Sequence, residues 1–358
     1  MDSNKTRSVL KGEELNTAKL KKYLLQQGLV ADVNSELEVR QFTNGFSNLT
    51  YLLKIEEKEY VLRRPPFGAI SRGHDMSREY NVLHHLNKSF SKAPKVYTYT
   101  EDQDIIGSSF YIMGKVEGII LNAKEAKRRN IPAIEFPIIA NSWLDTFVEL
   151  HQVDYKAVGL GDLGRPDGYV ERQVTNWGKQ YLKAATDEVP AAKQVMEWMQ
   201  ANQPKAYNFS LIHNDYKYDN IVFKDDSWKE VRAVLDWEMC TLGDPLMDLG
   251  TSIAYWTMST DGDMIKQGIA SPTVMEGNPG RTEIVEMYAQ KSGRPINHLV
   301  FYYVYGLFKI AVIAQQIYYR FHKGLTTDQR FANLNKASEL LCVMALQAIQ
   351  KNRIENLF

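Results

Sequence analysis

The chain has few cysteines, no excess of charge and no long apolar run. Cys240 and Cys342 are too few for a disulfide framework and lack metal-ligand spacing. Lys plus Arg and Asp plus Glu both number 43, which argues against a nucleic-acid-binding protein that relies on bulk basicity. The most apolar stretch, 300–317, is interrupted by Lys309 and several tyrosines. We therefore expect a buried helix there, and no membrane-spanning segment.

The sequence also shows no recognisable targeting segment and no flexible linker. The opening residues, Met-Asp-Ser-Asn-Lys-Thr-Arg, include no apolar core of a secretory signal. There are no internal repeats, low-complexity stretches or Gly/Ser linkers. A length of 358 residues, 44% of them hydrophobic and 24% charged, is typical of a soluble globular protein with about two packed units. We expect a cytoplasmic protein of a reducing compartment with neither nucleic acid nor membrane as partner; its oligomeric state stays open.

The organisation of the chain changes near residue 114. Before it, short strands are expected at 38–42, 49–55, 59–63 and 109–113, with helices at 17–27 and 76–86. After residue 118 helical periodicity dominates, for example at 307–321 and 333–350, and Ile139, Trp143, Phe147 and Leu150 share one helix face. The sequence predicts an α+β fold with a β-rich N-terminal lobe, residues 1–114, and a larger, mostly helical C-terminal lobe, residues 115–358.

The segment 211–223 contains the most informative motif. It places His213, Asp215 and Asn220 at the spacing His-x-Asp-x-x-x-x-Asn, and Asp236 ends an apolar run sixteen residues after the Asn. Phosphoryl transfer requires a carboxylate that receives the proton of the hydroxyl, and an amide oxygen and a second carboxylate that hold Mg²⁺ on the nucleotide phosphates. A polar hairpin whose Asp and Asn only form turns is the structural alternative.

These motifs identify a resemblance. The chain resembles the aminoglycoside phosphotransferase and choline kinase family of small-molecule kinases, which share the two-lobe protein-kinase-like fold. Within that family it is most similar to the branch associated with acyl-CoA dehydrogenases. The resemblance covers about residues 15–350 and rests on the segments 44–51, 61–66, 78–80, 213–220, 235–238 and 243–249. It implies ATP and Mg²⁺ as cofactors and a small hydroxylated molecule as substrate.

In the C-terminal lobe the resemblance implies a role for each motif residue. Asp215 is the catalytic base, and Asn220 and Asp236 are the ligands of Mg²⁺, which prefers sparse oxygen ligation. Lys217 is a second catalytic candidate that neutralises the transferring phosphoryl group, or else a solvated loop lysine. His213 is expected to order the metal loop by hydrogen bonding without doing chemistry.

In the N-terminal lobe the resemblance implies a nucleotide site. Ser47 and Asn48 belong to a turn over the phosphates, where backbone N–H groups cradle them. Arg63 is the strand-borne cation for the α and β phosphates, with Glu79 of the following helix as its partner; the alternative is an exposed pair of surface charges. Arg64 points to the opposite face if the strand is regular.

Two further segments frame the site. In the last strand and hinge, Met113 is expected to line the adenine pocket and Lys115 to lie beside the nucleotide. The Gly-Asp-Pro turn at 243–245 leads into a helix that we expect to begin near Leu249, capped by Asp248, and both Asp244 and Asp248 are interpreted as scaffold. Asp248 is also a candidate for holding the catalytic loop. No long activation segment follows, which argues against a protein kinase.

The acceptor is the least defined part of the prediction. Candidate side chains from the helical half are Arg172, Trp177, Tyr255, Lys309 and Arg320. Aromatic walls with cations suit an anionic or partly apolar hydroxylated molecule, and the acyl-CoA-dehydrogenase-associated branch implies a hydroxy acid or hydroxyacyl derivative. The aromatics are alternatively only core residues. Two other functions stay open: a catalytically silent protein that binds nucleotide or a partner, and an aminoglycoside phosphotransferase.

Overall fold

The computed structural model describes residues 6–32, 34–43, 48–66, 75–205 and 207–358. The chain divides into two compact units. The smaller unit takes in residues up to Ile120 together with Val158–Leu160 and Val222–Cys240; the helical unit comprises Leu121–Ala157, Gly161–Ile221 and Thr241–Phe358. The predicted boundary after residue 114 lies close to Ile120, where the chain first passes from the smaller unit to the helical unit. The chain then returns to the smaller unit twice, so the segment that carries Asp236 belongs with the N-terminal strands.

A six-stranded antiparallel sheet, in the order β1-β2-β3-β4-β6-β5, organises the smaller unit. Its strands are β1 (Thr6–Arg7), β2 (Leu37–Phe42), β3 (Leu49–Ile55), β4 (Lys58–Arg64), β5 (Val96–Thr100) and β6 (Phe110–Gly114). The four strands that the sequence predicted are confirmed within about one residue at each end. The short β1 and the strand β5 were not predicted.

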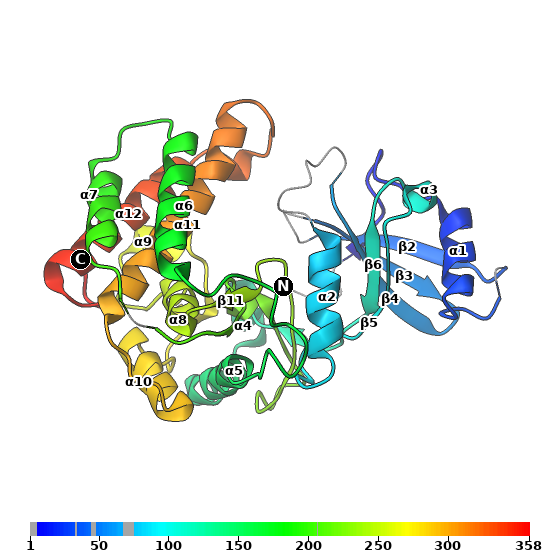
Figure 1. The fold of residues 1–358 in the computed structure, drawn as a ribbon, viewed down its shortest axis with the longest axis horizontal. Coiled ribbons are helices and arrows are strands. Elements are labelled where there is room, and N and C mark those ends of the chain that lie inside the picture. The colour runs from blue at the N-terminus through cyan, green and yellow to red at the C-terminus, as the bar shows by residue number, and fades with distance from the viewer. Residues whose placement is uncertain (1–5, 33, 44–47, 67–74, 206) are drawn as a thin grey trace. The chain divides into compact units, whose positions relative to one another are not determined.

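Helices cover both faces of this sheet (Figure 1). Helix α1 (Thr17–Gln26) packs Leu20 and Leu24 into a core with alternate residues of β3, β4 and β6, among them Leu62. Helix α2 (Met76–Leu86) lies against the other face, and α3 (Gln103–Ile106) is a single short turn. Because successive side chains of a strand alternate, Arg63 points to the α2 side while Arg64 returns to the α1 side, where its Nη1 donates to Ile106 O at 3.0 Å.

The helical unit is built around α11 (Leu299–His322), which packs against α6, α8 and α12. This helix is long and apolar enough to cross a membrane, but 72% of its most apolar window is buried inside the unit, as expected of a core helix. Gly250 of α8 and Gly306 of α11 meet where the two backbones touch, and a Cβ at either position would overlap the partner backbone. The other helices are α4 (Ala123–Arg129), α5 (Phe136–His151), α6 (Tyr169–Ala184), α7 (Pro190–Ala201), α8 (Pro245–Ala254), α9 (Asp263–Gly268), α10 (Arg281–Ser292) and α12 (Leu334–Lys351).

Short strands flank the two acidic motifs. In the helical unit β8 (Ser210–Ile212) pairs antiparallel with β11 (Thr241–Gly243). Strand β9 (Ile221–Phe223) joins β7 (Ile119–Ile120) and β10 (Val231–Val234) in a three-stranded sheet. Single turns of 3₁₀ helix occur at Ala133–Glu135, Tyr218–Asn220, Pro272–Val274 and Gln329–Phe331. The segment between β8 and β9, residues 213–220, is called the catalytic segment below, and it starts and ends on paired strands.

Candidate active site

The catalytic segment leaves β8 in a constrained conformation. Asn214 has φ 67°, a left-handed value that few non-glycine residues adopt and that Asn tolerates better than most. The N–H of His213 donates to Asp248 Oδ2 at 2.6 Å, and the N–H of Asn214 donates to Asp248 Oδ1 at 2.8 Å. The N–H of Asp215 donates to His213 Nδ1 at 3.3 Å. Three consecutive amides are thus anchored, which fixes the direction in which Asp215 leaves the backbone.

The carboxylate of Asp215 is held by two neighbours from its own loop. Lys217 Nζ lies 2.8 Å from both oxygens of Asp215, and the two side chains are 25% and 18% exposed. Asn220 Nδ2 donates to Asp215 Oδ2 at 2.9 Å and to its main-chain O at 2.8 Å. The structure brings the three predicted residues together around one carboxylate.

The orientation of the Asn220 amide follows from its partners. Both groups near one end of the amide are acceptors, a carboxylate and a carbonyl oxygen of Asp215, so this end must be the NH₂ group. The Oδ1 atom therefore points away from Asp215. A neutral oxygen in this position suits a hard cation such as Mg²⁺.

Lys217 is a charged member of the site and not a solvated loop residue. Burial acts to lower the pKa of its ammonium, but the neighbouring Tyr255 and Asp215 outweigh burial, so its pKa is raised. The ammonium also lies 4.8 Å from the centroid of the Tyr255 ring, a cation–π contact. A small cavity of about 30 Å³ adjoins this group and is lined in part by Asp219, a carboxylate that the sequence analysis did not single out. Burial raises the pKa of Asp219.

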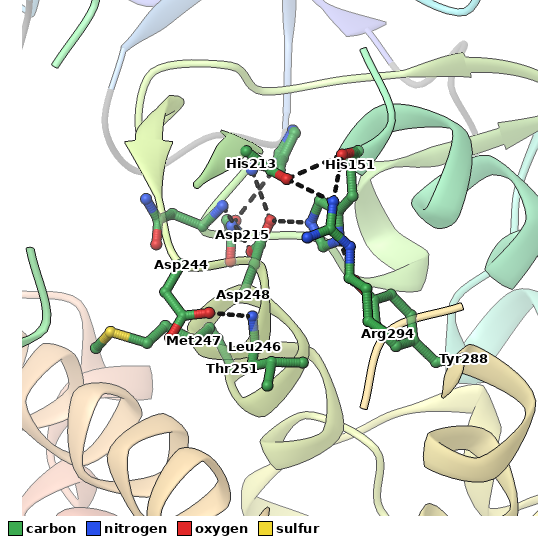
Figure 2. Close-up of polar contacts among 12 residues, drawn as sticks. His151, His213, Asp215, Asp244, Leu246, Met247, Asp248, Thr251, Tyr288 and Arg294 are labelled. Carbon is green, nitrogen blue, oxygen red and sulfur yellow. Dashed lines mark hydrogen bonds and ion pairs between the residues drawn. The ribbon is translucent and has the colours of Figure 1, made fainter. Parts of the chain in front are cut away.

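A buried network stabilises the loop from below (Figure 2). Asp248 is fully buried, and its Oδ2 also lies 3.2 Å from His151 Nε2, while His151 Nδ1 lies 2.7 Å from the Tyr288 hydroxyl. Burial lowers the pKa of His151, so the ring is neutral. Because a carboxylate only accepts, Nε2 carries the proton and Nδ1 accepts from Tyr288. Burial acts to raise the pKa of Asp248, but hydrogen bonds with His151 and with the backbone outweigh it, and its pKa falls below the ordinary value.

One part of the prediction for this turn was wrong. Helix α8 begins at Pro245, and its N-cap is Asp244, whose Oδ1 accepts from the N–H of Leu246 at 2.9 Å. Asp248 lies inside the first turn of the helix, where its carboxylate is free to face the catalytic loop. The predicted start near Leu249 was too late. Proline is favourable at the first position of a helix, so the Pro245 of the Gly-Asp-Pro turn is also the first residue of α8. The scaffold roles of Asp244 and Asp248 and the grip of Asp248 on the loop are confirmed.

In the smaller unit Arg63 is the centre of a charge cluster. Its Nη1 donates to Glu79 Oε1 at 2.7 Å, as predicted, and its Nη2 donates to Asp236 Oδ1 at 2.6 Å and Glu238 Oε2 at 3.1 Å. Burial acts to lower the pKa of Arg63, but Glu79 and Asp236 outweigh it and raise that pKa, so the guanidinium stays charged. Arg63 is thereby aligned next to the acidic motif by residues of two separate chain segments, helix α2 and the motif itself.

Asp236 is the most exposed carboxylate of this cluster. It has φ 67°, and its side chain is 34% exposed although it pairs with Arg63. Its neighbour Glu238 accepts from Asn48 Nδ2 at 2.8 Å, a contact that the sequence did not indicate. Asn48 is thus positioned by the acidic motif, whereas Ser47, predicted beside it, lies outside the described residues.

The predicted hinge residues lie on β6 and directly after it. Met113 lies on β6, the last strand, opposite Val61 of β4. The Lys115 ammonium lies 2.5 Å from Glu59 Oε2, so its charge is already partnered within the unit.

The five acceptor candidates do not form one pocket. Tyr255 contacts Lys217, whereas Arg172 donates to the backbone oxygens of Asp167 and Arg165. Arg320 is exposed eleven residues along α11 from Lys309, about 16 Å of helix. The remaining pair is buried: Lys309 Nζ lies 5.8 Å from the Trp177 ring and donates to Asn214 O at 2.6 Å. Lys309 therefore faces the catalytic segment and not an open acceptor site, which corrects the expectation from the sequence.

Comparison with known proteins agrees with this site. Residues 38–283 match the model of the phosphotransferase enzyme family. The chain belongs to that family. A crystal structure from Ralstonia eutropha JMP134, described as a candidate aminoglycoside phosphotransferase, is 31% identical, with a TM-score of 0.80 over 94% of this chain and 99% of the other. Choline kinase of Cryptosporidium parvum, at 11% identity, has the same fold, with a TM-score of 0.63 over 96% of this chain and 98% of its own.

The curated relatives of this chain are longer proteins. Acyl-CoA dehydrogenase family member 11 of Homo sapiens is 33% identical over 91% of this chain, and member 10 of Mus musculus is 32% identical over 95%. The chain spans 42% and 32% of the length of these two relatives. The predicted kinase-like α+β fold and the resemblance to the acyl-CoA-dehydrogenase-associated branch are both confirmed.

Proposed function

We propose that this phosphotransferase moves the γ-phosphoryl group of ATP to a hydroxyl group of a small molecule in a Mg²⁺-dependent reaction. The observation that carries the proposal is the Asp215 carboxylate, fixed between Lys217 and Asn220 on a loop whose backbone is bonded to Asp248. Use of ATP and Mg²⁺ is general in this family. One solved structure of the same fold is the ternary complex of APH(2″)-IIa with ATP and streptomycin.

The residues divide the chemistry between them. Asp215 orients the acceptor hydroxyl and takes its proton as the new oxygen–phosphorus bond forms, and the bond from the γ-phosphorus to the bridging oxygen breaks, which releases ADP. Lys217 offsets the charge of the phosphoryl group in transit. Arg63, held by Glu79, binds the nucleotide phosphates. Asn220 and Asp236 would hold Mg²⁺, which would neutralise charge on those phosphates.

For the acceptor we propose a hydroxy acid or hydroxyacyl derivative. The names of the curated relatives support this class, because acyl-CoA dehydrogenases act on acyl thioesters. A cavity beside Lys217 is lined in part by Trp143, Tyr255 and Trp256, and such aromatic walls suit a partly apolar acceptor. Its aromatic wall at Tyr255 is less suited to a polycation than a ring of carboxylates.

A panel assay tests the proposal. The wild-type protein is incubated with ATP and Mg²⁺ and with hydroxy acids, hydroxyacyl thioesters or aminoglycosides, and phosphorylated product is measured by mass spectrometry. We expect turnover with at least one hydroxylated acid or thioester. Preferential turnover of aminoglycosides favours an antibiotic-modifying role, the other candidate, which the Ralstonia relative supports. ATP binding without transfer to any acceptor favours a catalytically silent protein and contradicts the proposal.

The metal assignment makes a separate prediction. Asp236→Ala should leave ATP affinity nearly unchanged by Mg²⁺, because it removes the charged ligand, whereas Arg63 keeps Glu79 and Glu238 as partners. The measurement is an ATP titration with and without Mg²⁺. Asp225→Ala removes an exposed carboxylate from the same unit and serves as the control. Mg²⁺ dependence as strong in Asp236→Ala as in this control would place the metal elsewhere.

A further inference from the structure

Lys309 is a buried lysine that the proposed reaction does not use. It lies in the middle of α11, is 1% exposed, and donates from Nζ to the main-chain O of Asn214 at 2.6 Å. Burying an ammonium costs more free energy than burying an apolar side chain of similar length. A position in a core helix is therefore an unfavourable place for lysine unless its charge acts on a neighbour.

The peptide that Lys309 binds is the one that carries Asp215. The Asn214 carbonyl belongs to the Asn214–Asp215 peptide bond, whose N–H donates to His213 Nδ1. The preceding N–H, that of Asn214, is bonded to Asp248. Asn214 is consequently held at its amide by a carboxylate and at its carbonyl by an ammonium. Opposite charges on the two sides of one residue stabilise its left-handed conformation.

We infer that Lys309 is a positioning residue for phosphoryl transfer, which sets the direction of the Asp215 carboxylate by holding the Asn214 carbonyl. The inference rests on the proposed function, since it assigns a role in that reaction. Lys309 touches no reacting atom; it acts through one peptide group. Because the Lys309 ammonium is buried and bonded to a backbone carbonyl, it needs no group of the acceptor or the nucleotide as a partner.

The charge of Lys309 also responds to pH. The titratable groups around it are Asp248 of α8, Asp215 and Lys217 of the catalytic segment, and Tyr169 of α6, whose hydroxyl lies 3.4 Å from Asn214. Burial lowers the pKa of Lys309 to about 8, although Asp248 and Asp215 act to raise it. The ammonium is present below that pH and is lost as the pH rises through it. Wild-type kcat should therefore fall on the alkaline side in this range.

The test replaces Lys309 and a matched residue of the same helix. Gln315 is also a buried polar residue of α11, and its Nε2 donates to Ala184 O and to Thr186 Oγ1, both at 3.0 Å and both at the end of α6 and not in the catalytic segment. We expect Lys309→Met to lower kcat at least about tenfold with little change in the Michaelis constant for ATP, and to remove the alkaline fall. Gln315→Met should lose similar stability and keep kcat within about threefold.

Amide hydrogen exchange supplies a readout that needs no acceptor. Lys309→Met should speed exchange in the peptide 211–217 at least about tenfold, while Gln315→Met should not. Lys309→Gln keeps an N–H donor without the charge and is measured in the same way if Lys309→Met fails to fold. Unchanged exchange and kcat, or equal effects in the Lys309 and Gln315 variants, would overturn the inference. If the wild type transfers no phosphate, the proposed function fails, and the exchange comparison still decides the positioning role.

Discussion

Asp215→Asn is expected to lower phosphoryl transfer by a factor on the order of a hundred to ten thousand. The amide has nearly the same shape but cannot accept the proton of the acceptor hydroxyl, and it carries no charge for Lys217, which lies 2.8 Å from both carboxylate oxygens in the wild type. ATP affinity should remain, because the residues proposed to bind the nucleotide and its metal, Arg63, Glu79 and Asp236, lie in other segments of the chain and are not changed.

Turnover and ATP affinity are measured side by side for this variant. Asp225→Asn makes the same chemical change in an exposed carboxylate and should behave as wild type. Turnover within tenfold of the wild type would reject Asp215 as the base. Loss of ATP binding together with turnover would instead indicate that the change unfolds the loop, and circular dichroism and thermal unfolding separate these outcomes.

Asp248→Asn is expected to lower both stability and activity. Asp248 accepts from the amides of His213 and Asn214, and one of its oxygens also serves His151. An Asn side chain has one acceptor oxygen, so its NH₂ group must face at least one backbone N–H in a site closed to water. Each buried donor left without an acceptor costs about 1–3 kcal/mol of unfolding free energy. Asp215 comes directly after the two residues that Asp248 holds, so a displaced backbone there also misplaces its carboxylate, and kcat should fall at least about tenfold.

Asp244→Asn is the matched control for this prediction. Asp244 is also buried and lies in the same turn, but its two partners tolerate an amide: Asn caps helices as well as Asp does, and the Tyr302 hydroxyl at 2.7 Å can accept as well as donate. Burial raises the pKa of Asp244 to about 6, so a neutral side chain is accommodated there. Equal loss of stability in the two variants, measured by denaturant unfolding, would contradict the role of Asp248.

The pH dependence distinguishes the same two residues. A folded-state pKa below the ordinary value means that Asp248 stabilises the fold fully at neutral pH and loses that contribution only as the pH falls through the lowered pKa. The pKa of Asp244 is raised, so its effect has the opposite sign: stability decreases as the pH rises from the ordinary pKa of an aspartate to about 6 and changes no further above that pH.

Local patterns explain most of what could be predicted. Alternation in β4 separated Arg63 from Arg64, and the helix that begins at Met76 offered Glu79 as partner, so this ion pair was predictable. Strand β5 was missed although its sequence, Val-Tyr-Thr-Tyr-Thr, is rich in β-branched and aromatic residues. The roles of Glu238 and Asp219 had no local signal, because neither spacing nor periodicity indicates what a side chain will meet.

The sequence by itself determined the chemistry: a carboxylate, a lysine and an amide at fixed spacing in one loop, and a second acidic motif nearby along the chain. Only the tertiary structure decided how that loop is held. Asp248 reaches it across 35 residues and Lys309 across 95, from helices whose approach depends on close packing, such as the glycine contact of α8 with α11. Spacing along a chain specifies neighbours within a few residues, whereas the partner of a buried charge is set by which helices pack together. For that reason Lys309 looked like a ligand for an acceptor in the sequence and lies against the catalytic backbone in the fold.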